Sequence, residues 1–270
     1  MGHGELRWTG TQTAAAGANA RAAAYTSAAE RAPDPLAERA SRGSHDRVHV
    51  AVTTDERDAF LALVLGPDDA EPARFIDRLL ARGVEVGTIY LDLLGPTAVT
   101  LGDMWVEDTC DFFDVTIGVG RLQRAVRDLG QAFVMRGADA TPAGRVLLSS
   151  LPGDQHTLGM FMVAEFLLRD GWGVRVGTPG TADDLAAMLR DEWFDVVGFS
   201  AACDVRLLAL RHQVAAVRRY SRNPHVRVLV GGRVFVEHPE LAARVGADAF
   251  ATSAEDAPSR ARALLDSRSS

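Results

Sequence analysis

The sequence contains no lysine, and all 29 of its basic residues are arginines. This absence excludes functions that depend on a lysine side chain, such as P-loop nucleotide hydrolysis and Schiff-base or pyridoxal chemistry. The 36 acidic residues outnumber the basic ones and give a formal net charge of −7. A chain with this charge balance is not expected to bind nucleic acid by itself, because such binding requires a basic face.

Cysteine and long apolar runs are also scarce. Cys110 and Cys203 are too few for a disulfide framework or a cysteine-rich zinc site, and such usage is typical of a reducing compartment. No apolar run approaches the ~18 residues that a membrane span needs, and the beginning of the chain lacks the features of a secretory signal. We therefore predict a cytoplasmic protein that does not associate with a membrane.

The 270 residues predict about two domains at roughly 150 residues each. Residues 1–50 stand apart from the rest, because the first forty include thirteen alanines and, as large aliphatic residues, only Leu6 and Leu36. Such a segment buries too little apolar surface to offset the entropy lost on ordering. We predict a disordered or weakly ordered tail at 1–50, and both a leader without function and a docking arm remain open for it.

Residues 51–138 have the apolar spacing of helices and show no alternation typical of strands. The third of four predicted helices spans Val86 to Glu107, with a kink or break expected at Pro96. The fourth runs from about Cys110 to Met135. Four helices joined by short loops predict a compact helical bundle.

From residue 144 to 268 the pattern changes to short apolar strands alternating with helices. This alternation predicts a parallel, doubly wound sheet that is covered on both faces. We predict a flavodoxin-like α/β domain of five strands in the order 2-1-3-4-5. The strands are expected at 145–151, 173–177, 195–200, 226–231 and 249–251.

Residues with possible ligand roles follow three of these strands. Asp154 and His156 follow the first strand, Ser200 ends the third, and Gly231 and Gly232 end the fourth. Ligands of open parallel sheets bind beyond the carboxyl ends of the strands. An aspartate two residues before a histidine can hold the imidazole in one tautomer, as is usual for a metal ligand. Taken singly, each feature is equally typical of a surface histidine, a helix cap or a turn.

In combination, these residues resemble the three-part signature of the cobalamin-binding domain family, which here reads Asp154-x-His156-x-x-Gly159, then Ser200, then Gly231-Gly232. The resemblance implies that His156 is the lower axial ligand of the cobalt and that Asp154 supports it. It also implies that Ser200 hydrogen-bonds the displaced benzimidazole, and that Gly231 and Gly232 line the channel for the nucleotide tail. Gly159 would leave room beside the sheet.

The helical region carries a second resemblance. Leu101-Gly102-x-x-Trp105 resembles the Leu-Gly-x-x-Trp element in the four-helix cap of methionine-synthase-type cobalamin modules. This likeness implies that Trp105 lies over the upper face of the corrin. The alternative for Trp105 is a residue of the bundle core.

The cap segments 90–96, 101–108 and 110–118 are similar to the AerR/PpaA group, and the likeness covers about residues 55–265. These proteins are cobalamin-dependent antirepressors of photosynthesis genes in purple bacteria. Light-sensing transcription factors that bind adenosylcobalamin carry a Glu-His pair where this chain has Val115-Thr116. Those sensors also place a DNA-binding helix-turn-helix before the cap, and the tail composition does not predict one here.

The AerR/PpaA likeness implies a light-responsive regulator that is not an enzyme. It would bind cobalamin in the hydroxo or aquo form, with the adenosyl and methyl forms also open. It would act on a transcriptional repressor of the CrtJ/PpsR type and would meet DNA only through that partner. Two alternatives remain: a stand-alone corrinoid protein that carries methyl groups for a methyltransferase, and a haem-binding redox sensor with His156 or Cys203 as ligand.

Overall fold

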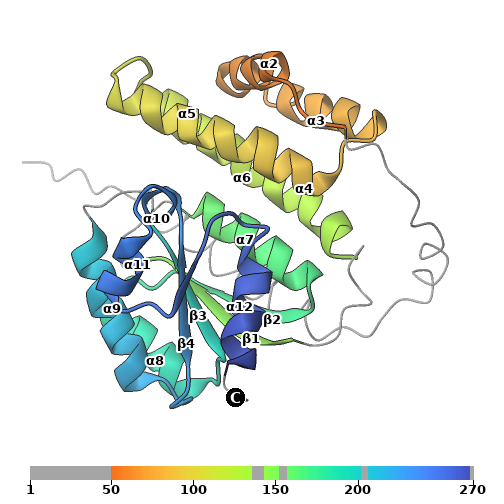
Figure 1. Cartoon of the computed structure of the whole chain (residues 1–270). Helices are drawn as coiled ribbons and strands as arrows, with labels where there is room; N and C mark the ends of the chain where they lie inside the picture. Colours follow the sequence, from red (N-terminus) through yellow and green to blue (C-terminus); the bar gives the residue numbers. More distant parts are fainter. Residues whose placement is uncertain (1–49, 136–142, 152–156, 202–205, 268–270) are drawn as a thin grey trace, which may run out of the picture.

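The computed structural model describes residues 50–135, 143–151, 157–201 and 206–267. It contains a layer of helices from residue 54 to 135, which we call the helical cap, and an α/β unit from residue 144 to 266 (Figure 1). The predicted tail at 1–50 lies outside the described residues except for Val50. Figure 1 shows the cap lying across one side of the α/β unit, above α7 (Leu158–Arg169).

The cap contains the four helical runs that the sequence predicts. They are α2 (Thr54–Leu65), α3 (Glu71–Ala81), the continuous run α4–η2–α5 (Val86–Thr88, Ile89–Leu94 and Gly95–Val106) and α6 (Phe112–Met135). In the described part of the chain, no helix combines the length and the apolar character needed to cross a bilayer.

Pro96 does not break the third helical run. The six residues before Gly95 form a wide π turn, in which the Gly95 N–H reaches the carbonyl of Tyr90. Proline has no N–H to donate to the preceding turn. The wider π turn accommodates the missing hydrogen bond, so the helix does not end there. The expected break is therefore a local widening, and α5 continues in line with α4.

The sheet is parallel throughout and has the order β2-β1-β3-β4-β5, as the sequence predicts. Its strands are β1 (Gly144–Ser149), β2 (Trp172–Gly177), β3 (Val196–Ser200), β4 (Arg227–Gly231) and β5 (Ala249–Ala251). The covering helices are α7, α8 (Ala182–Asp191), α9 (Leu207–Tyr220), α10 (Arg233–Glu237), α11 (Glu240–Val245) and α12 (Ala257–Asp266). The sequence analysis did not predict α10.

The core of the cap continues into one face of the sheet. A single cluster of buried apolar side chains joins the cap helices to α7, α12 and strands β1 and β2, whereas a separate cluster lies under α8 and α9 on the other face. Helix α7 is apolar nearly all round because it lies between the cap and the sheet. The rings of Tyr90, Phe133 and Phe166 meet edge to face at this junction, with centroids 5.0 to 6.1 Å apart. The cap and the α/β unit therefore share one core.

Glu56 ties the first two cap helices together. It completes a capping box with Thr53 and binds the guanidinium of Arg82 beyond the end of α3. The hydrogen bond from Arg82 and that from the Thr53 backbone lower the pKa of Glu56 to about 2. Because this pKa is depressed, the stabilisation is complete above pH ~4.5 and is lost as the pH falls toward 2.

We expect Glu56→Gln to lower the free energy of unfolding by about 1 kcal/mol at pH 7, because it weakens a charged hydrogen bond between two helices. The difference from the wild type should shrink between pH 4.5 and 3. Urea unfolding followed by circular dichroism at pH 7, 4 and 3 measures both effects. Glu71→Gln is the matched control, since it removes only the exposed pair with Arg74. An equal loss at pH 7 and pH 3 would contradict the assignment.

Candidate functional site

Three of the predicted site residues meet where β3 and β4 end. Ser200 pairs in register with Gly231, and the N–H of Ala201 donates to the Gly231 carbonyl at 2.9 Å. Gly159, in the first turn of α7, faces the same place: a Cβ built on it would lie 3.8 Å from the Ser200 Oγ. Residues distant in the sequence thus share the carboxyl edge of the sheet, where parallel folds bind ligands.

The glycines at this edge have two different roles. Gly232 has φ +105° and ψ 168°, and a Cβ built on it would lie 2.2 Å from the carbonyl oxygen of Ala201. Only glycine fits there. Gly231 and Gly159 are under no such constraint, since a Cβ on either would meet its nearest neighbour at 3.5 Å or more. The missing side chain of Gly159 therefore leaves space beside Ser200, and that of Gly231 leaves space beside Ala251, that packing alone does not require.

Asp154 and His156 lie outside the described residues, as does Cys203. The flanking residues are described. Thr157, directly after His156, accepts a hydrogen bond at 3.5 Å from the amide of Gln123 in cap helix α6. The connection that carries the two predicted residues thus rejoins the fold between the cap and the edge of the sheet.

Trp105 lies near the end of α5 with 47% of its surface exposed. Its ring meets the edge of Phe112, at the start of α6, with centroids 6.3 Å apart. A residue of the bundle core would be buried, so the core alternative for Trp105 is wrong. The exposed indole and the Phe112 ring instead form an aromatic surface on the cap.

An ion pair links this end of the cap to the edge of the sheet. The guanidinium of Arg233 lies 3.4 Å from Asp103, two residues before Trp105 on α5. Arg233 itself directly follows Gly232 and also binds Glu237 in α10. Figure 1 shows the end of α5 above α10. The sequence analysis missed this contact, because nothing local in the sequence signals a pair 130 residues apart.

Cys110 differs from the sequence prediction, which placed it at the start of the fourth helix. Helix α6 begins at Phe112, so Cys110 lies before its first turn. Partial burial of the thiol, together with the charges of Asp114 and Asp111, raises the pKa of Cys110. Since only the thiolate is nucleophilic, Cys110 is poorly suited to redox or covalent chemistry.

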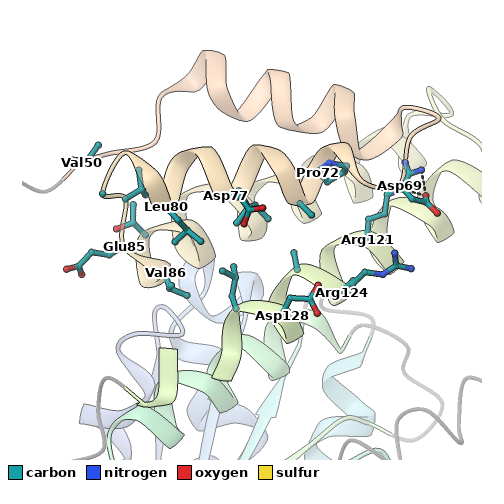
Figure 2. A pocket seen from close by; sticks show the side chains of 17 residues that line it. Val50, Asp69, Pro72, Asp77, Leu80, Glu85, Val86, Arg121, Arg124 and Asp128 are labelled. Atoms are coloured by element: carbon teal, nitrogen blue, oxygen red, sulfur yellow. Dashed lines mark hydrogen bonds and ion pairs between the residues drawn. The ribbon is translucent and has the colours of Figure 1, made fainter. Parts of the chain in front are cut away.

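A hollow among the described residues lies elsewhere. It is a cavity of about 620 Å³ between α3 and α6, on the side of α6 away from the α/β unit. Figure 2 shows Asp77 of α3 facing Arg124 and Asp128 of α6 across it, with the Asp69–Arg121 ion pair at one end. None of the predicted site residues that the structure describes lines this cavity. Among the described residues, no cluster of three or more His, Cys, Asp or Glu side chains is arranged to hold a metal ion.

The α/β unit is similar to a known family. Residues 144–262 match the family described as B12 binding domain. The match covers every strand and all three segments of the predicted signature.

Individual relatives extend the likeness into the cap. The chain is 28% identical over 172 residues to an uncharacterized 20.5 kDa protein in the bchF-crtJ intergenic region of Rhodobacter capsulatus, covering 64% of this chain and 89% of the relative. This relative is consistent with the predicted AerR/PpaA likeness. The chain is also 26% identical over 220 residues to dimethylamine corrinoid protein 1 of Methanosarcina acetivorans, covering 80% of this chain and 94% of the relative.

A solved structure shows the same fold. The monomethylamine corrinoid protein of Methanosarcina barkeri superposes with a TM-score of 0.66 over 79% of this chain and all of its own length, at 18% identity. The fold of a helical region followed by a five-stranded parallel sheet is thus that of a corrinoid protein.

The described residues fit a cobalamin, which the match to the B12 binding domain family supports as the ligand. A corrin with a nucleotide tail needs a polar contact and a clear path beside the sheet. Ser200 offers a hydroxyl there, and the open positions at Gly159 and Gly231 form a cradle that Cβ atoms would narrow. The exposed aromatic surface of Trp105 and Phe112 offers an apolar cover on the cap side.

Proposed function

We propose that this chain is a light-responsive cobalamin sensor that acts as an antirepressor, binding a DNA-bound repressor of the CrtJ/PpsR type. The cradle beside Ser200, within the region of the B12 binding domain match, is the observation that carries the proposal. The regulatory part is supported by the likeness to the protein from the bchF-crtJ region. We also propose that the chain is divided into a tail (1–50), a helical cap (51–138) and a cobalamin-binding domain (144–268).

Each predicted residue has a defined task in this proposal. His156 would ligate the cobalt, and Asp154 would hold its imidazole in the required tautomer. Ser200 donates to the benzimidazole of the tail, while Gly159, Gly231 and Gly232 leave space for the tail. Trp105 covers the upper face.

When bound, cobalamin supplies a cobalt centre whose upper ligand light can exchange. Trp105 and Phe112 would sense the bulk on that face, since Trp105 contacts Phe112 and lies two residues after Asp103, which pairs with Arg233 at the edge of the sheet. The Asp103–Arg233 pair is solvent-exposed on both sides and worth at most about 1 kcal/mol, so a small change above the corrin can move the end of α5. A partner protein with a higher affinity for one position of the cap than for the other then responds to the ligand state of the cobalt.

We expect purified protein to bind hydroxocobalamin with a spectral shift that His156→Ala abolishes, because no other predicted residue ligates the cobalt. Ultraviolet–visible spectra of protein incubated with hydroxocobalamin, and with adenosylcobalamin before and after illumination, measure this. His238→Ala is the control, since its exposed imidazole lies between α10 and α11. A spectrum unchanged by His156→Ala would refute the ligand assignment. A Soret band in the purified protein would instead favour the haem sensor.

A second function, a corrinoid carrier of methyl groups, is favoured by the likeness to dimethylamine corrinoid protein 1. It would use the same cofactor residues, so cobalamin spectra do not separate the two functions. Binding of the purified repressor by the hydroxocobalamin-loaded protein supports the sensor. Methylation of the reduced protein by a methylamine methyltransferase, with no repressor binding, supports the carrier.

A further inference from the structure

The end of the cap where α5 passes into α6 is strongly acidic. Between Gly83 and Gly120 the sequence has no Arg, Lys or His. The first basic residue of α6, Arg121, is held by Asp69 and by the carbonyls of Val64 and Gly66. The acidic residues of the cation-free segment are Glu85, Asp92, Asp103, Glu107, Asp108, Asp111 and Asp114.

Apolar side chains are exposed within this acidic end. Val106 is 81% exposed, Phe113 72% and Ile117 50%. Phe113 and Ile117 are four residues apart on α6 and so lie one above the other on the same side of the helix. Contiguous exposed apolar surface with a polar rim marks an interaction site more often than an inert surface.

This patch does not belong to the cobalamin site. The side of α6 that faces the α/β unit is marked by Gln123, which binds Thr157, and by Gly130, which meets Glu165 of α7. Phe112 precedes Gln123 by three full helical turns and lies on that side, next to Trp105. At 100° per residue, Phe113 and Ile117 lie roughly 80–140° around the helix axis from the side of α6 that faces the α/β unit. Their exposure is therefore not explained by the corrin.

We infer that Val106, Phe113 and Ile117, with their rim of Glu107, Asp108, Asp111 and Asp114, form a docking surface for a protein partner whose basic face surrounds an apolar recess that takes the Phe113 ring. This inference rests on the proposed function, of which it names the partner surface. Charge complementarity selects the occupant. A symmetric second copy would bring the same acidic residues against each other, and an anionic membrane surface would repel them.

The surface is connected to the cobalamin side by aromatic contacts. Phe113 meets Phe112 at 6.1 Å between ring centroids, and Phe112 meets Trp105 at 6.3 Å. A displacement of Trp105 by what lies above the corrin therefore changes how Phe113 is presented. Through this contact, the affinity of the partner for the surface around Phe113 differs between the two ligand states of the cobalt.

The start of α6 is built so that the charges can be removed without unfolding it. The Asp111 carboxylate accepts the N–H groups of Phe113 and Asp114 at 2.8 and 2.9 Å, a cap that asparagine supports equally well. Asp108 has φ +55°, which asparagine also tolerates. A variant with Glu107→Gln, Asp108→Asn, Asp111→Asn and Asp114→Asn therefore tests the charge and keeps the shape.

The test measures binding of the full-length, hydroxocobalamin-loaded protein to the purified repressor by biolayer interferometry at about 50 and 200 mM salt. We expect Phe113→Ser to raise the Kd at least about tenfold, as for a central aromatic contact, and the neutral variant to raise it and flatten its salt dependence. Leu208→Ser, which removes an exposed apolar residue from α9, should leave the Kd unchanged. Cobalamin spectra of all variants should match the wild type.

The outcomes separate this inference from the proposed function. Repressor binding that both Phe113→Ser and the neutral variant leave intact overturns the docking surface alone. Wild-type protein that takes up cobalamin but does not bind the repressor overturns the antirepressor function and the surface together. Self-association in sedimentation that Phe113→Ser abolishes overturns the inference in favour of a second copy.

Discussion

A Gly232→Ala variant is expected to lose about 3 kcal/mol or more of stability, because two penalties combine. The φ and ψ of Gly232 lie in a region that is almost exclusive to glycine. In addition, the new Cβ would lie 2.2 Å from the carbonyl oxygen of Ala201, which belongs to backbone that extends β3 and has no free rotamer. The loop must move, and with it the hydrogen bond from Ala201 to Gly231.

Thermal unfolding of the apo-protein measures this effect, and a drop of the Tm by roughly 6–12 °C is expected for a chain of this size. Gly231→Ala is the matched control, because a Cβ there meets Ala251 at ordinary contact distance. The control should unfold within a few degrees of the wild type and yet bind hydroxocobalamin more weakly, since its methyl group narrows the cradle. Equal Tm values for both variants would contradict the distinction between the two glycines.

A Gly130→Ala variant is expected to weaken the junction of cap and α/β unit by about 2–3 kcal/mol, as overpacking of a tight contact does. Gly130 lies on α6 against α7, and a Cβ there would come within 2.5 to 2.8 Å of the Glu165 carboxyl group. Glu165 is almost fully buried, so its carboxylate has little room to move without losing its surroundings. The two helices must therefore separate.

The control for this variant lies on the same helix. Gly120 is exposed and a Cβ on it would meet nothing within 4 Å. Gly120→Ala should stabilise by about 0.5–1 kcal/mol through helix propensity, and the opposite sign at Gly130 then isolates the contact with Glu165. Urea unfolding compares the free energies of the two variants. Stabilisation by both would show that the cap is not pressed against α7 at this point.

The fold was largely predictable from the sequence, because its signals are local. Continuous apolar strands alternating with helices specify a doubly wound sheet, and β5 lies at 249–251 as predicted. Where the prediction failed, a longer-range or subtler cause was at work. The π turn before Pro96 is a local adjustment that periodicity does not reveal, and α10 was hidden by the Gly231-Gly232 pair, which is also typical of a turn.

The site was predictable only in part. Gly159, Ser200 and Gly231 were expected to meet, since parallel strands end at one edge, and the structure brings them together. The sequence left Trp105 between a core position and a ligand-facing position, because amphipathic spacing permits both. Its exposure decided against the core.

The sequence by itself determined the absence of lysine chemistry, the acidic balance, the order of the strands and the signature residues. Each of these depends on residue identity or short-range pattern. The tertiary structure alone decided that Asp103 meets Arg233 across the chain, that Gly232 is required by the backbone whereas Gly231 is not, and that Phe113 is left exposed on the cap. These facts depend on how helices and strands pack, and the side-chain environment that packing creates is not encoded at any single position.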